Sequence, residues 1–317
     1  MPTVVLGPAA AQDRGVVVPG RFRVELAELV ALARAGGHRL PFDVSGVGAA
    51  GEERPAWIAR LSPEPSPADQ LAVLLGEQAA REQVAAADPD RAAVRAAMST
   101  ALGVLAGAEV LLEVRLGLRL GPRAPRQARA WVGVRGETVV SLATVSGALF
   151  ELAWTTPAAL PELLAHLVRL PDGPPPRAGE PEPPERFTLP VELMAATGVG
   201  AARHREDLLA GLVERFPGAV TGPDGEAYDA GAAHALLDTV RERLTARLRV
   251  VVAGPRAEEI GGAAGAVVWM RLGAQWFALD PDQVAGFPVA RARAVVPRDL
   301  ARAVGPVLAR VWGRERG

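Results

Sequence analysis

The sequence predicts an internally duplicated α+β protein in which a central antiparallel sheet is flanked by helices. A proline-rich segment divides the 317 residues into two stretches. Both stretches show the same order of helical and strand-like patterns, and short turns join consecutive strands within each of them. Strands joined by such turns pair antiparallel, and helices cover the apolar faces of the sheet that results.

The dividing segment spans residues 171–186 and reads PDGPPPRAGEPEPPER. Proline lacks a backbone donor and disfavours helix in the residue before it, so this segment is expected to be a semi-rigid linker. The alternative, a long surface loop within one domain, changes the organisation little. We therefore expect an N-terminal α+β half over residues 1–170 and a C-terminal α+β half over residues 187–317.

The first half is predicted to contain a short strand at 21–24, helices, four further strands and a last helix. Apolar residues recur at helical spacing over 90–107, which predicts a helix there. The next segment, VLLEVRLGL, alternates apolar and polar residues as a half-buried strand does. ARAWVGVRG and ETVVSLATV follow with a tight turn at Arg135–Gly136, and ALFELAWT comes next. Pro157 then opens the last helix, because proline is tolerated in a first turn.

The second half repeats this series. AGAAHALLDTVRERLTAR, residues 230–247, predicts the helix, and LRVVVAG predicts the strand after it. AGAVVWMRLG and AQWFALDP are expected to form a hairpin that turns near Gly273, followed by the strand ARARAVV. Pro297 opens the final helix.

The spacing of matching residues supports a duplication. Arg21 matches Arg186, and further along the chain Pro157 matches Pro297 at a shorter sequence offset. Between them the strand residue Val110 matches Leu248, and the same offset aligns Trp131 with Trp269. The fall in offset between the first match and these strand matches assigns about 27 extra residues to the first half, within the proline-rich region 40–90.

Composition excludes several classes of chemistry. All 35 basic residues are arginine and there is no cysteine, which excludes lysine Schiff bases, P-loop lysines, thiol catalysis and cysteine-bound metals. A formal net charge of -1 gives no overall footprint for nucleic acid. No uninterrupted apolar run approaches the roughly 18–20 residues that cross a bilayer, and the N-terminus does not resemble a signal peptide. We expect a soluble cytoplasmic protein that does not insert into membranes.

No pattern of residues predicts catalysis, a cofactor site or a metal site. The four histidines, His38, His166, His204 and His234, show no spacing typical of metal ligands. Residues 46–51 spell GxGxxG, but Pro55 falls in the first turns of the helix that a dinucleotide site requires. The Asp-Pro-Asp segments at 88–90 and 280–282 are expected to be turns or helix caps. We therefore predict that the chain is not an enzyme and carries no cofactor.

Arginine and tryptophan supply the candidate binding residues. Arg115, Arg119, Arg123, Arg126 and Arg129 cluster in EVRLGLRLGPRAPRQARA, either as a solvated strand face and loop or as a binding loop for an acidic partner. Four of the six tryptophans lie on predicted strands: Trp131, Trp154, Trp269 and Trp276. Most of them are expected in the core, and an exposed one would mark a protein-binding surface.

Five segments, in this order, resemble the EspG proteins of actinobacterial type VII secretion. They are VELAELVALARAGG, DPDRAAVRAAMSTALGVLAGAEVLLEVRL, ARAWVGVRGETVVSLATV, TTPAALPELLAHLVRLPDGPPP with RFTLPVELMAA, and VVWMRLGAQWFALDP with VVPRDLARAVGPVLARVW. The resemblance covers nearly the whole chain as pattern and order, without a short diagnostic motif. It implies a quasi-two-fold α+β structure with one large antiparallel sheet shared between the halves.

The resemblance also implies a function. EspG proteins are cytoplasmic chaperones without cofactor or catalysis that bind the helical tip of PE–PPE-type heterodimers and keep these secretion substrates soluble. The family's substrate-contacting loop corresponds to residues 121–128, which gives Arg123, Arg126 and Gln127 as candidate partner-binding residues beside Trp269 and Trp276. Two alternatives stay open: an enzyme with a site in a cleft between the halves, and a structural or regulatory homodimer.

Overall fold

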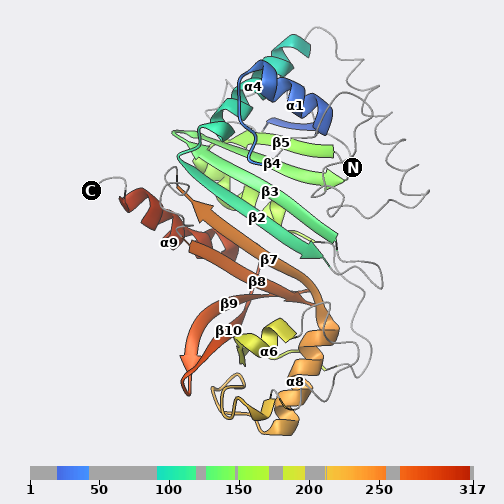
Figure 1. The fold of residues 1–317 in the computed structure, drawn as a ribbon, viewed down its shortest axis with the longest axis vertical. Coiled ribbons are helices and arrows are strands. Elements are labelled where there is room, and N and C mark those ends of the chain that lie inside the picture. Colours follow the sequence, from blue (N-terminus) through green and yellow to red (C-terminus); the bar gives the residue numbers. More distant parts are fainter. Residues whose placement is uncertain are drawn as a thin grey trace, which may run out of the picture.

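The computed structural model describes residues 20–42, 91–118, 126–146, 149–170, 181–196, 211, 213–254 and 265–314. Within these residues it shows an α+β protein built on one large antiparallel sheet (Figure 1). No helix among them is both long enough and apolar enough to span a membrane. The GxGxxG segment, Arg119, Arg123, His204 and most of the predicted linker lie outside the described residues.

The sheet has ten strands in the order β1-β5-β4-β3-β2-β7-β8-β9-β10-β6, and every neighbouring pair is antiparallel. The strands preceding the proline-rich segment are β1 (Gly20–Glu25), β2 (Val110–Leu118), β3 (Arg126–Arg135), β4 (Thr138–Ser146) and β5 (Leu149–Thr155). Those after it are β6 (Arg186–Pro190), β7 (Leu244–Ala253), β8 (Gly265–Leu272), β9 (Gln275–Val284) and β10 (Phe287–Val295). The order reads the same from either edge: the first strand of each half lies outermost and the second lies at the centre.

The two halves meet where β2 pairs with β7. Their register runs from Leu111 opposite Ala253 to Leu118 opposite Ala246, so the sheet continues without interruption from one half into the other. Val114 and Val250 face each other at the middle of this junction, and both are fully buried. The paired strands therefore share a core as well as hydrogen bonds.

One face of the sheet, which we call the α5/α9 face, is covered at its centre. Helix α5 (Leu160–Leu167) comes from the first half and α9 (Asp299–Arg314) from the second, and the two pack on each other. Alternate residues of β2 and β7 point into the core beneath them, because successive side chains of a strand point to opposite faces. Leu164 and Val304, both fully buried, are the central contributions of the two helices.

The opposite face is covered at its two ends. Helices α1 (Leu26–Ala35) and α4 (Arg91–Ala106) lie over β3, β4 and β5 at one end, and α6 (Val191–Ala196) and α8 (Ala230–Arg243) contribute to the core at the other (Figure 1). Each end has its own apolar cluster, around Phe150 and Phe277 respectively. Between the two clusters, this face of β2 and β7 carries charged and partly exposed side chains.

The predicted alignment of Val110 with Leu248 is compatible with the fold, because both residues are buried in the core of the α5/α9 face. The alignment of Trp131 with Trp269 at the same offset was wrong: Trp131 packs under α1 and α4, whereas Trp269 lies in the core of the α5/α9 face. The turn residues Gly136 and Gly273, with φ of 54° and 59°, follow β3 and β8 and lie one residue closer in sequence than that offset requires. An error of one residue moves a strand side chain to the other face.

Two element predictions were also wrong. The helix expected over 230–247 ends at Arg243, and residues from Leu244 join β7, where the Thr245 hydroxyl donates to the carbonyls of Arg271 and Gly273. The turn expected at 280–282 is part of β9, paired there with β10 only. Pro281 is compatible with that strand because its missing N–H falls beyond the pairing with β8.

Candidate docking surface at the centre of the sheet

Eight side chains form a band on the centre of the opposite face, and we call it the basic strip. They come from four adjacent strands in the sheet order β3-β2-β7-β8. Their positions follow from alternation: their neighbours along the strands, such as Leu112, Val114, Leu248 and Val250, belong to the α5/α9 core. The members of the basic strip are Glu113, Arg115, Gln127, Arg129, Arg247, Arg249, Val251 and Val268.

Three arginines of the basic strip stand in one row across the strands. Arg115 on β2 is in register with Arg129 on β3 and with Arg249 on β7. Val268, 39% exposed on β8, continues the row opposite Arg249. Like charges directly opposite one another on neighbouring strands destabilise a sheet. The row therefore opposes folding, and packing of the sheet gives no reason for it.

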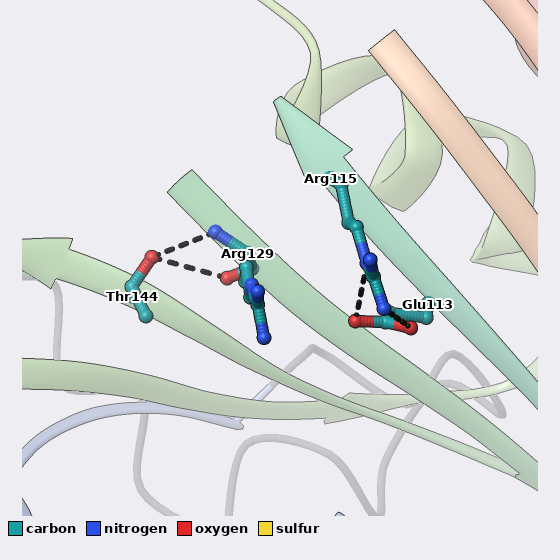
Figure 2. Close-up of polar contacts among 4 residues, drawn as sticks. All are labelled: Glu113, Arg115, Arg129 and Thr144. Atoms are coloured by element: carbon teal, nitrogen blue, oxygen red, sulfur yellow. Dashed lines mark hydrogen bonds and ion pairs between the residues drawn. The ribbon is translucent and has the colours of Figure 1, made fainter. Parts of the chain in front are cut away.

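A single carboxylate offsets part of this charge. Arg115 donates to both oxygens of Glu113, at 2.7 and 2.8 Å, and the two residues lie two positions apart on β2 (Figure 2). This hydrogen bonding to Glu113 raises the pKa of Arg115 above its ordinary value. The pair is partly exposed, with 48% of the Arg115 side chain accessible, so it stabilises the fold by at most about 1 kcal/mol.

Arg129 is fixed through its backbone rather than its charge. The Thr144 hydroxyl on β4 accepts from the Arg129 N–H at 2.9 Å and donates to its carbonyl at 3.2 Å (Figure 2). The Arg129 Nε atom is buried without a hydrogen-bond acceptor. Across the described ranges, neither Arg129 nor Arg249 forms an ion pair. Within the described residues, the charges of two of the three arginines in the row are therefore not neutralised by a carboxylate.

Arg247 ties the basic strip to the helical end of the second half. One of its Nη atoms donates to the carbonyl of Met194 on α6 at 3.0 Å. Burial lowers the pKa of Arg247 below its ordinary value, but an arginine this basic stays charged at neutral pH. The strip as defined therefore holds four positive charges and one negative charge, with Val251 and Val268 as apolar neighbours.

The structure separates the residues that the sequence grouped as partner-binding. Gln127 is exposed and belongs to the basic strip, opposite Gly117. Arg126 begins β3, and Arg123 lies outside the described residues. Trp269 and Trp276 are 1% and 3% exposed, with ring centroids 6.1 Å apart in the α5/α9 core, so they present almost no surface to a partner.

Sequence reasoning missed Arg247 and Arg249. The signal that identifies Arg249 is the alternation of LRVVVA: Leu248 and Val250 are buried, which directs Arg249 to the other face. Arg115 and Arg129 belong to an arginine cluster that the sequence itself shows. Only the register of β2 with β7 shows that Arg249 stands beside them.

The described histidines lie apart from one another and from the basic strip. His166 on α5 accepts from Nη1 of Arg21 at 3.4 Å, and burial, helped by the charge of Arg21, lowers its pKa. His38 contacts the Ser99 hydroxyl at 3.5 Å, and His234 contacts the carbonyl of Ala230 on its own helix. Within the described ranges, no three His, Cys, Asp or Glu side chains are grouped so that they could hold a metal ion.

The fold has counterparts among solved structures, whereas the sequence alone finds no relatives. No family model and no curated protein matches the sequence. The chain is similar to the type VII secretion system chaperone EspG5 of Mycobacterium tuberculosis, whose structure was solved in complex with a PE25-PPE41 dimer. The two chains are 15% identical, the TM-score is 0.48, and the match covers 91% of this chain and 96% of the other.

Proposed function

We propose that this protein is a cytoplasmic chaperone of a type VII secretion system that binds a helical, PE–PPE-like secretion substrate through the basic strip. The observation that carries the proposal is the arginine row. Arg115, Arg129 and Arg249 stand in register on an accessible sheet face, although their mutual repulsion opposes folding. A feature that weakens the fold and has no packing role is best explained by a binding partner.

The pattern of the five segments described above supports a helical secretion substrate as the partner. Those segments resemble chaperones that hold helical heterodimers soluble before export. Val251 and Val268 add apolar surface beside the arginines, which suits a partner tip that combines charged and apolar side chains. Covering such a tip would prevent its aggregation and leave the rest of the substrate free for the secretion machinery.

We further propose that the two halves arose by duplication and that only one binding site results. The symmetric strand order supports a duplication, and so do the equivalent positions of the turn glycines Gly136 and Gly273. The first half supplies Glu113, Arg115, Gln127 and Arg129 to the basic strip, and the second half supplies Arg247, Arg249, Val251 and Val268. Each half therefore supplies different residues to the centre of the sheet, so the basic strip is asymmetric and can favour one orientation of the partner.

Co-expression tests this proposal. The chain would be produced with any helical WxG- or PPE-type products encoded beside its gene, and complex formation would be followed by gel filtration. Gly117 lies beside the basic strip on β2, opposite its member Gln127. A Cβ atom added at Gly117 would come no closer than 3.9 Å to another residue, so Gly117→Trp should fold and block the surface. Val296→Trp places the same bulk at a residue that is 52% exposed outside the strip.

We expect a stable complex and increased partner solubility with the wild-type chain and with Val296→Trp. Gly117→Trp should abolish both effects. Failure of the wild-type chain to form a complex with any neighbouring helical product would contradict the chaperone role. A complex that tolerates both substitutions equally would show that binding takes place elsewhere on the molecule.

A further inference from the structure

We infer that the basic strip binds an acidic helix that lies across the strands, with carboxylates seven residues apart on one helical face. This inference rests on the proposed function and specifies the part of the partner that the chaperone contacts. It is carried by the register of the arginine row and by which of its members lack an ion-pair partner.

The unpaired positive charges of the basic strip predict that the partner is acidic. Arg129 and Arg249 have no ion pair within the described residues, while Arg115 is already engaged by Glu113. Arginine guanidinium groups bind carboxylates through two parallel hydrogen bonds. A partner that places one carboxylate near Arg129 and one near Arg249 would therefore neutralise both outer charges and relieve the repulsion along the row.

The spacing between Arg129 and Arg249 predicts that the partner is an α-helix. Neighbouring strands lie about 4.8 Å apart, so Arg129 on β3 and Arg249 on β7, two strands away, start about 9.6 Å apart. Residues i and i+7 of an α-helix lie on one face and about 10.5 Å apart along its axis. The difference of about 1 Å is small compared with the reach of two arginine side chains. A helix that runs perpendicular to the strands therefore advances by about one turn for each strand that it crosses.

The remaining positions of the row make the expected pattern specific. Arg115 stands between the two outer arginines and is paired with Glu113, so the middle of the helix has no need of a third carboxylate. Val268 lies one strand beyond Arg249, about 14 Å from the start of the row. An apolar residue at i+10 or i+11 of the helix would lie over it. The expected pattern is acidic at i and i+7 and apolar at i+10 or i+11.

Two other occupants fit the observations less well. A second copy of the chain packed face to face would bring one arginine row against another, since a two-fold interface pairs each surface with itself. Nucleic acid would meet the row, but Glu113 stands among the arginines and Val251 and Val268 flank them. A phosphate backbone gains nothing from these three residues.

The test uses the full chain and a labelled synthetic peptide of about 18 residues in an alanine- and glutamine-rich helical background. The matched peptide carries Glu at i and i+7 and Leu at i+11, and its control has the same composition with the second Glu at i+5, on the other side of the helix. A labelled single-stranded oligonucleotide serves as the third probe. Binding would be measured by fluorescence anisotropy.

The variants are Arg129→Gln, Arg249→Gln and, as a control, Arg293→Gln. Arg293 is an exposed strand arginine on the α5/α9 face, opposite Ala278 of β9. Removing an arginine from the row relieves repulsion, so the first two variants should be at least as stable as the wild-type chain. Circular dichroism during heating checks this directly.

We expect the matched peptide to bind at least about 5-fold more tightly than its control, and each of Arg129→Gln and Arg249→Gln to weaken that binding by about 3- to 10-fold. Arg293→Gln should change it by less than about 2-fold, and raising the salt concentration should weaken it. Equal binding of the two peptides, or tighter binding of the oligonucleotide, would overturn the inference.

Failure of this inference can be told apart from failure of the proposed function. A partner complex that is lost with Gly117→Trp but retained by the double variant Arg129→Gln, Arg249→Gln would leave the site in place and reject the acidic helix. Absence of any complex with the wild-type chain would reject the function itself.

Discussion

Trp269→Ala is expected to lower the free energy of unfolding by about 3–5 kcal/mol, because it empties a large volume in a packed core. Trp269 is 1% exposed and lies in the cluster that joins β2, β7, α5 and α9. That cluster includes residues from both halves, so its loss would loosen their junction. Urea denaturation followed by circular dichroism measures the change.

Val268 provides the matched control for this substitution. It is the adjacent residue, points to the opposite face and is 39% exposed, so Val268→Ala should cost less than about 1 kcal/mol. Trp269→Phe should cost less than the alanine variant, since it keeps most of the volume and removes an indole N–H that is buried without an acceptor. A Trp269→Ala variant as stable as the wild-type chain, with partner binding selectively lost, would contradict the burial of this ring and restore its predicted role.

Val250→Asp is expected to destabilise both halves strongly. Val250 is fully buried at the centre of β7, directly opposite Val114 of β2. A carboxylate there would have no cation within its core cluster, and an uncompensated buried charge costs about 3–5 kcal/mol or more. Domains of this kind are stable by only about 5–15 kcal/mol, so this cost would remove a large part of the free energy of unfolding.

Val251→Asp separates this effect from the mere introduction of a charge. Val251 is the next residue along β7, only partly buried, and lies on the basic strip opposite Glu113. Arg249 and Arg115 can offset an added carboxylate there, so this variant should unfold within about 1 kcal/mol of the wild-type chain. If both aspartate variants were equally stable in thermal denaturation, the assignment of the two faces of β7 would be wrong.

Local patterns in the sequence predicted the elements and their order, because apolar periodicity and turn residues act over short distances. The strand over 110–118 and the turn at Gly136 are examples. Local patterns were not enough to predict which residues of the two halves are equivalent. Trp131 and Trp269 share a residue type and a plausible offset, but a single-residue shift between strands placed them on opposite faces.

The candidate site depended on contacts that no local pattern contains. Arg115 and Arg249 are far apart in the sequence and become neighbours only through the register of β2 with β7. The arginine cluster was visible in the sequence, but only the register of the folded sheet shows that Arg115 and Arg129 line up on one face. Burial likewise decided that Trp276 packs in the core.

Site-specific photo-crosslinking tests the central claim most directly. A benzoylphenylalanine would replace Val268 on the basic strip in one chain and Val296, which is 52% exposed outside it, in another. Each would be irradiated in cells that also produce the neighbouring helical gene products. We predict a crosslink from position 268 to an acidic helix of the partner and none from position 296. Crosslinks from position 296 alone, or equally from both positions, would contradict the assignment of the basic strip as the docking surface.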